Sequence, residues 1–254
     1  MDLQLTTKTA LITGASQGIG RATAISLATE GVKTAIAARR GELLQKVADD
    51  IDAAGHTRPI VIAHDIMTDD GPESLAAKAL EALGTIDILI NSAGGSRKVD
   101  LYAGAATWDE GMNMNFNTQR RLSHALLPQM IERKWGRIIT ISGKNEPEKH
   151  PGKINVAMSA KAAIHAWSKG LSNEVSQHGV TVNCLGPGKI MSEQIRNNYS
   201  EERRRQYAEE EIPIGYIGEP EDMAVVATFL CSPLARYVTG ALIPVDGSFR
   251  KYAF

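Results

Sequence analysis

Residues 13–20 have the sequence TGASQGIG, in which Gly14, Gly18 and Gly20 follow the spacing G-x-x-x-G-x-G. This stretch leads from a short apolar run, Thr9–Thr13, directly into a helix-length segment. A glycine turn at such a junction lets backbone N–H groups and a helix N-terminus face a pyrophosphate, because no Cβ blocks the approach. The same glycines also fit an ordinary tight turn, but their position between the first strand and the first helix favours a dinucleotide site.

Short apolar runs alternate with helix-length segments along almost the whole chain, an order typical of a parallel sheet with helices on both faces. We therefore predict an α/β fold, a Rossmann-like doubly wound parallel sheet of about seven strands, in a single domain over residues 1–254. The predicted strands are Thr9–Thr13, Lys33–Ala37, Ile60–Ala63, Ile86–Ile90, Arg137–Ile141, Val180–Cys184 and Leu242–Val245. The predicted helices are Ile19–Glu30, Glu42–Ala54, Pro72–Leu83, Trp108–Arg133, Ala157–His178 and Glu219–Cys231. The charged segment Ser200–Glu211 is expected to be an exposed helix, either a lid or a solvated face.

Composition excludes several classes of protein. The chain has 28 Lys and Arg residues against 29 Asp and Glu residues, so we expect neither nucleic acid nor an anionic membrane surface as a partner. An apolar fraction of 43% argues against general disorder. Cys184 and Cys231 have no motif spacing, so we expect neither a disulfide framework nor a metal site. The N-terminus lacks a signal-peptide pattern and no apolar stretch approaches the ~20 residues of a membrane span, which predicts a cytoplasmic protein.

Further segments follow the glycine turn along the chain: NSAG at 91–94, Asn115, Lys161, Asn183, Pro187–Gly188 and Val245–Gly247. Taken in order with the glycine turn, they resemble the classical short-chain dehydrogenase/reductase family. The resemblance covers nearly the whole chain and implies an oxidoreductase that uses a nicotinamide dinucleotide and acts on a small molecule. It also implies a homo-oligomer, a tetramer or a dimer, assembled through the two long helices and the C-terminal segment.

The end of the second predicted strand bears on the choice of cofactor. Family members that use NAD place an acidic residue there, whereas this chain has Arg39 and Arg40. A guanidinium pairs with a 2′-phosphate that a carboxylate would repel, so we expect NADP(H) over NAD(H); the alternative is a pair of solvated arginines. Asp65 follows the third strand where the family contacts adenine, although it also suits a helix N-cap. The residues expected at the cofactor are Gly14, Ser16, Gln17, Gly18, Ile19, Gly20, Arg39, Arg40, Asp65, Ile66, Asn91, Ala93, Gly94, Lys161, Pro187, Gly188, Ile190 and Ser192.

The residues expected to carry out catalysis depart from the family pattern. The family reduces carbonyls with Tyr-x-x-x-Lys on one helix, a serine at the preceding strand end and an asparagine. Lys161 and Asn115 match, but Ala157 stands four residues before the lysine and Gly143 stands where the catalytic serine belongs. The ordinary ketoreductase mechanism therefore does not carry over, because alanine cannot donate a proton.

A loop after the fifth strand offers a replacement acid. The 2,4-dienoyl-CoA reductase branch of the family also lacks the tyrosine, keeps the lysine and in one form draws its acid from this loop. By distance from the lysine that acid falls near Glu146, which is our candidate catalytic acid beside Lys161 and Asn115. His150 is the alternative, since its ordinary pKa already lies near neutrality. Each of the two also suits a solvated loop.

Three functions remain open. The first is an NADPH-dependent reductase of an activated C=C, C=N or C=O bond. The second is a catalytically inactive cofactor-binding subunit or regulator that pairs with an active homologue. The third is a redox-neutral enzyme, a lyase or isomerase, in the same pocket.

Other single residues receive structural interpretations. His124, His165 and Trp167 are expected in helix packing or a subunit interface, and Cys184 in the core. Tyr199 or Tyr207 of the predicted lid is expected to touch the substrate. The aromatic tail, residues 249–254, is expected to be buried against another surface.

Overall fold

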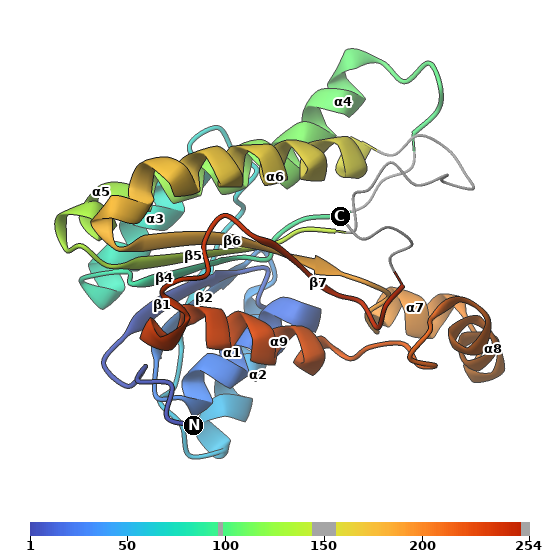
Figure 1. Ribbon diagram of the computed structural model, residues 1–254, viewed down its shortest axis with the longest axis horizontal. Helices are drawn as coiled ribbons and strands as arrows, with labels where there is room; N and C mark the ends of the chain where they lie inside the picture. Colours follow the sequence, from blue (N-terminus) through green and yellow to red (C-terminus); the bar gives the residue numbers. More distant parts are fainter. Residues whose placement is uncertain (96–98, 144–155, 250–254) are drawn as a thin grey trace.

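Seven parallel strands form one sheet in the order β3-β2-β1-β4-β5-β6-β7. The computed structural model describes residues 1–95, 99–143 and 156–249. Helices cover both faces of the sheet (Figure 1), which confirms the predicted doubly wound α/β fold. The strands are β1 Thr9–Thr13, β2 Lys33–Ala38, β3 Ile60–Ala63, β4 Ile88–Asn91, β5 Gly136–Ile141, β6 Val180–Pro187 and β7 Leu242–Val245.

The helices lie in two layers, with α1, α2 and α9 on one face and α3, α5 and α6 on the other (Figure 1). Helices α7 and α8 lie beyond the carboxyl ends of β6 and β7 (Figure 1). The helices are α1 Gly18–Thr29, α2 Gly41–Ala53, α3 Gly71–Leu83, α4 Ala105–Met112, α5 Thr118–Glu132, α6 Val156–Val175, α7 Glu193–Asn198, α8 Glu201–Glu211 and α9 Pro220–Cys231. Helix α8 confirms the exposed helix predicted for that segment.

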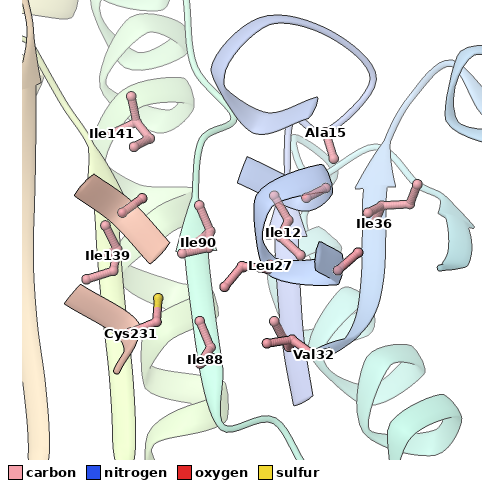
Figure 2. Packing of buried hydrophobic residues seen from close by; sticks show 14 of the residues in the cluster. Ile12, Ala15, Leu27, Val32, Ile36, Ile88, Ile90, Ile139, Ile141 and Cys231 are labelled. Carbon is pink, nitrogen blue, oxygen red and sulfur yellow. The ribbon is translucent and has the colours of Figure 1, made fainter. Parts of the chain in front are cut away.

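The sheet is buried on both faces because successive side chains of each strand point to opposite layers. Leu11 packs with the α3, α5 and α6 cluster, whereas its neighbour Ile12 packs with the α1, α2 and α9 cluster. Figure 2 shows Leu27 of α1 and Cys231 of α9 among the isoleucines of the central strands. Burial of both faces explains why the predicted strands have nearly continuous apolar sequences.

The long helix predicted at Trp108–Arg133 differs from the structure. It begins earlier, at Ala105, and is divided into α4 and α5 by a π-helical turn at Asn113–Asn117. A π turn accommodates an extra residue and re-aims the side chains within it. Here the turn directs Asn115 towards the end of β4, where its Oδ1 accepts the Gly95 N–H at 3.1 Å.

Two further elements were not predicted at these bounds. Helix α7 has no counterpart among the predicted helices. Strand β6 continues three residues past Cys184, as far as Pro187, because it pairs with β7 along that length. Within the described residues, no helix is long and apolar enough to cross a membrane.

Candidate functional site

A cleft of about 420 Å³ lies at the carboxyl ends of the strands. It spans the point between β1 and β4 where the strand order reverses, which is where open α/β sheets bind ligands. The buried Thr13 hydroxyl fixes this point: it accepts the N–H groups of Ser92 and Ala93, each at 3.1 Å, and lies 3.3 Å from the Ile90 carbonyl. One side chain thereby joins the ends of the two central strands.

The glycine turn forms one wall of the cleft. A Cβ on Gly14 would lie 2.8 Å from the Ser92 carbonyl oxygen, so the turn packs directly on the loop after β4. A Cβ on Gly18 would have no atom within 4 Å, although its φ of +56° favours glycine. The N-cap of α1, Gln17, makes no side-chain capping bond. Free N–H groups at a helix N-terminus beside open space suit a phosphate group.

The end of β2 contributes two exposed arginines to the cleft, Arg39 and Arg40. Arg40 Nη2 donates to Gln17 Oε1 at 2.6 Å, which connects the arginine pair to the glycine turn. His64 also lines the cleft. Its Nδ1 is 3.3 Å from Lys78 Nζ, and its Nε2 is 2.8 Å from the Gly71 carbonyl oxygen. Because an ammonium only donates, His64 Nε2 carries the ring proton.

Asp65 and Ile66, after β3, also line the cleft. The Asp65 carboxylate accepts the N–H of Met67 at 3.0 Å, within its own loop. Helix α3 instead begins after Asp70. The helix N-cap alternative for Asp65 is therefore wrong.

The loop after β4 is held by the π turn and by α5. Asn115 is 1% exposed; its Oδ1 accepts the Gly95 N–H and its Nδ2 donates to the Gly111 carbonyl at 3.0 Å. Gln119 Nε2 donates to the Ala93 carbonyl at 2.9 Å. These bonds fix the backbone that faces the glycine turn, so Asn115 supports the cleft from behind.

The Lys161 side chain reaches from α6 to the end of β5. Lys161 Nζ donates to the Ser142 carbonyl at 2.7 Å, and both residues line the cleft. Burial lowers the pKa of the Lys161 ammonium to about 8. The Ser142 hydroxyl in turn lies 2.6 Å from His165 Nε2. A partly desolvated cation therefore borders this end of the cleft.

Most of the residues expected at the cofactor lie in this one cleft. Glu146 and His150 of the loop after β5 lie outside the described residues. The expected residues that line the cleft are Gly14, Ser16, Gln17, Gly18, Ile19, Arg39, Arg40, Asp65, Ile66, Ala93, Gly94, Lys161 and Pro187. Those that do not line it are Gly20, Asn91, Gly188, Ile190 and Ser192, and Asn115, expected in catalysis, does not line it either.

The residues outside the lining have visible structural roles. Asn91 Nδ2 donates to the Ser123 hydroxyl at 3.1 Å, on the side of α5. A Cβ on Gly188 would lie 2.6 Å from Asp246, so this glycine allows the ends of β6 and β7 to approach. Ser192 caps α7 by accepting the Ile195 N–H at 3.2 Å. Ile190 lines a second, smaller pocket of about 240 Å³.

Several cleft residues were not predicted from the sequence. Ser142 and His64 follow strand ends, the positions at which cleft residues are expected, but belong to no motif. His165 was expected only in packing, yet it contacts Ser142 at the cleft. Its spacing of four residues from Lys161, which places both on one helix face, is the signal that could have identified it.

The structural interpretations of His124, Trp167 and Cys184 are confirmed. The rings of His124 and Trp167 pack at 5.6 Å between centroids, outside the cleft lining. Cys184 is a buried free thiol, and burial raises its pKa to about 11, which suits a core residue rather than a nucleophile. Tyr207 packs on Phe249 and lies below Lys189, outside the cleft lining, so the contact of Tyr199 or Tyr207 with substrate stays a prediction. Among the described residues, no group of His, Cys, Asp and Glu side chains is arranged to hold a metal ion.

Comparisons with known proteins agree with this geometry. The chain matches the enoyl-(acyl carrier protein) reductase family over residues 14–249. It is 33% identical to the 3-oxoacyl-(acyl-carrier-protein) reductase FabG of Aquifex aeolicus over 248 residues, which cover 97% of this chain and 99% of that protein.

Two solved structures resemble the whole chain. L-sorbose reductase from Gluconobacter frateurii, complexed with NADPH and L-sorbose, is 29% identical with a TM-score of 0.92, over 99% of this chain and 100% of that chain. A 7α-hydroxysteroid dehydrogenase complexed with NADH and 7-oxoglycochenodeoxycholic acid is 30% identical with a TM-score of 0.89, over 97% of this chain and 96% of that chain. The strand order, the glycine turn and these matches together show that the chain belongs to the classical short-chain dehydrogenase/reductase family of NAD(P)-dependent oxidoreductases.

Proposed function

We propose that this protein is an NADP(H)-dependent oxidoreductase with a non-standard active site, formed by a single cytoplasmic domain. The observation that carries the proposal is the pair Arg39 and Arg40, exposed in the cleft at the end of β2. Arg40 already reaches the turn at Gln17, so a 2′-phosphate beside the glycine turn would meet two guanidinium groups. The L-sorbose reductase neighbour is complexed with NADPH.

The charge of the cleft supports the same cofactor. Among the described residues, its lining includes three cationic side chains, Arg39, Arg40 and Lys161, against one carboxylate, Asp65. A dinucleotide with a 2′-phosphate carries more negative charge than one without it. A cleft with a surplus of cations at its arginine end therefore favours NADP(H) over NAD(H).

The residues of the cleft fit the parts of a nicotinamide dinucleotide. The uncapped α1 N-terminus and Gly18 would hold the pyrophosphate, and Asp65 with Ile66 would border the adenine. A bound nicotinamide supplies or accepts the hydride. Lys161, with its pKa lowered to about 8, would hold the ribose of that end and stabilise negative charge nearby.

The proton donor of the proposed reaction is not a tyrosine. Ala157 is 4% exposed and lies beside Asn115 at a void of about 10 Å³. Its methyl group cannot donate a proton, and Gly143 has no side chain to hold a substrate oxygen. We propose Glu146 as the acid, with His150 as the alternative, and Lys161 and Asn115 as the retained members of the site.

The substrate class follows from the same chemistry. An activated C=C, C=N or C=O bond accepts hydride without strong protonation at the start of the reaction. The FabG relatives are named for 3-oxoacyl substrates, and the two neighbouring structures hold L-sorbose and a 7-oxo steroid. Enones, imines and 3-oxoacyl thioesters are therefore the small molecules to screen first.

A fluorescence titration with NADPH and with NADH tests the cofactor proposal. We expect NADPH to bind more tightly, and Arg39→Ala and Arg40→Ala each to weaken NADPH about tenfold while NADH changes little. Arg58→Ala is the matched control, because Arg58 is an exposed arginine paired with Asp49 and does not line the cleft. Equal or tighter binding of NADH, or binding of neither nucleotide, would contradict the proposal.

Ala157 also favours a second candidate, a catalytically inactive subunit that binds the cofactor and pairs with an active homologue. The two candidates differ in one measurement. The reductase oxidises NADPH in isolation when an acceptor is present. The inactive subunit binds NADPH with the same affinity but consumes it only beside its partner.

A further inference from the structure

Ser142, at the end of β5, is held by two side chains from one face of α6. Lys161 and His165 are one helical turn apart, so both point the same way. Lys161 Nζ binds the Ser142 carbonyl at 2.7 Å, and His165 Nε2 binds the Ser142 hydroxyl at 2.6 Å. The Ser142 N–H donates to the Leu185 carbonyl at 2.8 Å. Every polar group of this residue is therefore engaged.

Loss of these hydrogen bonds of Ser142 would cost stability, because the residue is buried. Ser142 is 1% exposed, so a hydroxyl deprived of its imidazole partner would remain desolvated. Ser142 follows the last residue of β5, Ile141, and therefore lacks the full ladder of hydrogen bonds that fixes the strand itself. The imidazole supplies the hydrogen bond that holds its side chain.

The position of the Ser142 carbonyl matters because it orients a cation of the cleft. Lys161 has a flexible stem, and a hydrogen bond to a fixed carbonyl selects one position for its ammonium. A cation held before the ligand arrives binds the ligand more tightly than one that must be ordered on binding.

We propose that His165 is a positioning residue of the nucleotide site: through the Ser142 hydroxyl it fixes the carbonyl that orients the Lys161 ammonium. The inference rests on the proposed function, since it assigns His165 to the site at which NADP(H) is proposed to bind. It replaces the expectation that His165 serves only in packing.

A double-mutant cycle in NADPH affinity tests this role. We expect His165→Phe to weaken NADPH about fivefold to tenfold, as for loss of one buried hydrogen bond, and Ser142→Ala to do the same. Neither change should add to the loss already caused by Lys161→Met, because all three act through one contact. His165→Gln, whose side-chain amide reaches the position of Nε2, should recover most of the affinity. His124→Phe, a histidine on α5 outside the cleft lining, is the matched control.

Additive losses, or unchanged NADPH affinity in both His165→Phe and Ser142→Ala, would overturn the inference. If the wild-type protein binds no NADPH, the proposed function fails. The role of His165 is then tested in the protein without bound nucleotide. Titration of the ¹³C-labelled Lys161 side chain by NMR should then show a midpoint moved by more than ~0.5 pH unit in His165→Phe and Ser142→Ala. An unmoved midpoint in both variants overturns it.

Discussion

Lys161 makes the stability of the protein depend on pH in alkaline solution. Burial lowers the pKa of its ammonium from 10.5 to about 8 in the folded chain. Between these values Lys161 binds more protons in the unfolded chain, so the contribution of this residue to the free energy of unfolding rises with pH. The cost of burying the charged lysine is fully present below pH 8 and is lost as pH approaches 10.5.

We expect Lys161→Met to remove this rise, which is on the order of 2 kcal/mol for a partly buried group. Urea unfolding at neutral pH and in steps towards pH 10.5 measures it. Lys169→Met is the control, because Lys169 is an exposed lysine on the same helix. The prediction is wrong if the variant and the wild-type protein gain the same stability over this range.

The turn between β1 and α1 contains two glycines with different roles. Packing requires one of them, and the proposed cofactor requires the other. A Cβ on Gly14 would lie 2.8 Å from the backbone of Ser92, whereas a Cβ on Gly18 would meet no atom within 4 Å. Gly14→Ala should therefore destabilise the fold by several kcal/mol, through the clash and the positive φ. Gly18→Ala should lower stability by only about 1 kcal/mol, from the positive φ alone.

For NADPH affinity we expect the opposite order: Gly18→Ala should have a larger effect than its small loss of stability suggests. The Cβ of Gly18→Ala would occupy the space proposed for the pyrophosphate and should weaken NADPH more than tenfold. Thermal unfolding and NADPH titration of the same two variants provide the test. Gly55→Ala, at another positive φ with open space but outside the cleft lining, is the control. Normal NADPH affinity in Gly18→Ala would exclude this wall as the pyrophosphate site.

At the level of elements, local patterns predicted much of the structure, and side-chain contacts between elements explain the rest. The ranges of β1, β3 and β7 follow from local apolar runs and agree with the structure. The local pattern does not predict the π turn, and the bond that Asn115 makes within it reaches Gly95 on a separate loop. His165 was misassigned for the same reason, since its partner Ser142 becomes a neighbour only when α6 packs on the sheet.

At the level of the whole molecule, the strand order explains why motifs far apart in the sequence meet. All strands are parallel, so the residues after β1, β2, β4 and β5 come to one edge of the sheet. The glycine turn and the two arginines could thus be assigned to one cleft from their position after a strand. The proposed acid Glu146 is several residues past the end of β5, in a loop without a motif, so its position after a strand does not by itself assign it to the cleft.

The outer face of α9 bears on the assembly of the molecule. Its inner residues are buried against α1, but Val225 and Phe229, one turn apart, are 61% and 39% exposed. Leu234 and Tyr237, just beyond the helix, are 41% and 99% exposed. Exposed apolar side chains on one helix face and in the turn after it favour an interaction site. We propose that it contacts a second copy of the chain in a homo-oligomer.

The wild-type protein should therefore sediment as a dimer or a tetramer at micromolar concentration. The double variant Val225→Glu with Phe229→Glu should sediment as a smaller species, because charges buried at an apolar contact cost several kcal/mol. It should keep its NADPH affinity, since neither residue lines the cleft. Gln206→Glu, which adds charge to the exposed face of α8, should leave the assembly unchanged. A monomeric wild-type protein would contradict the proposed contact, and an unchanged double variant would assign the assembly to another surface.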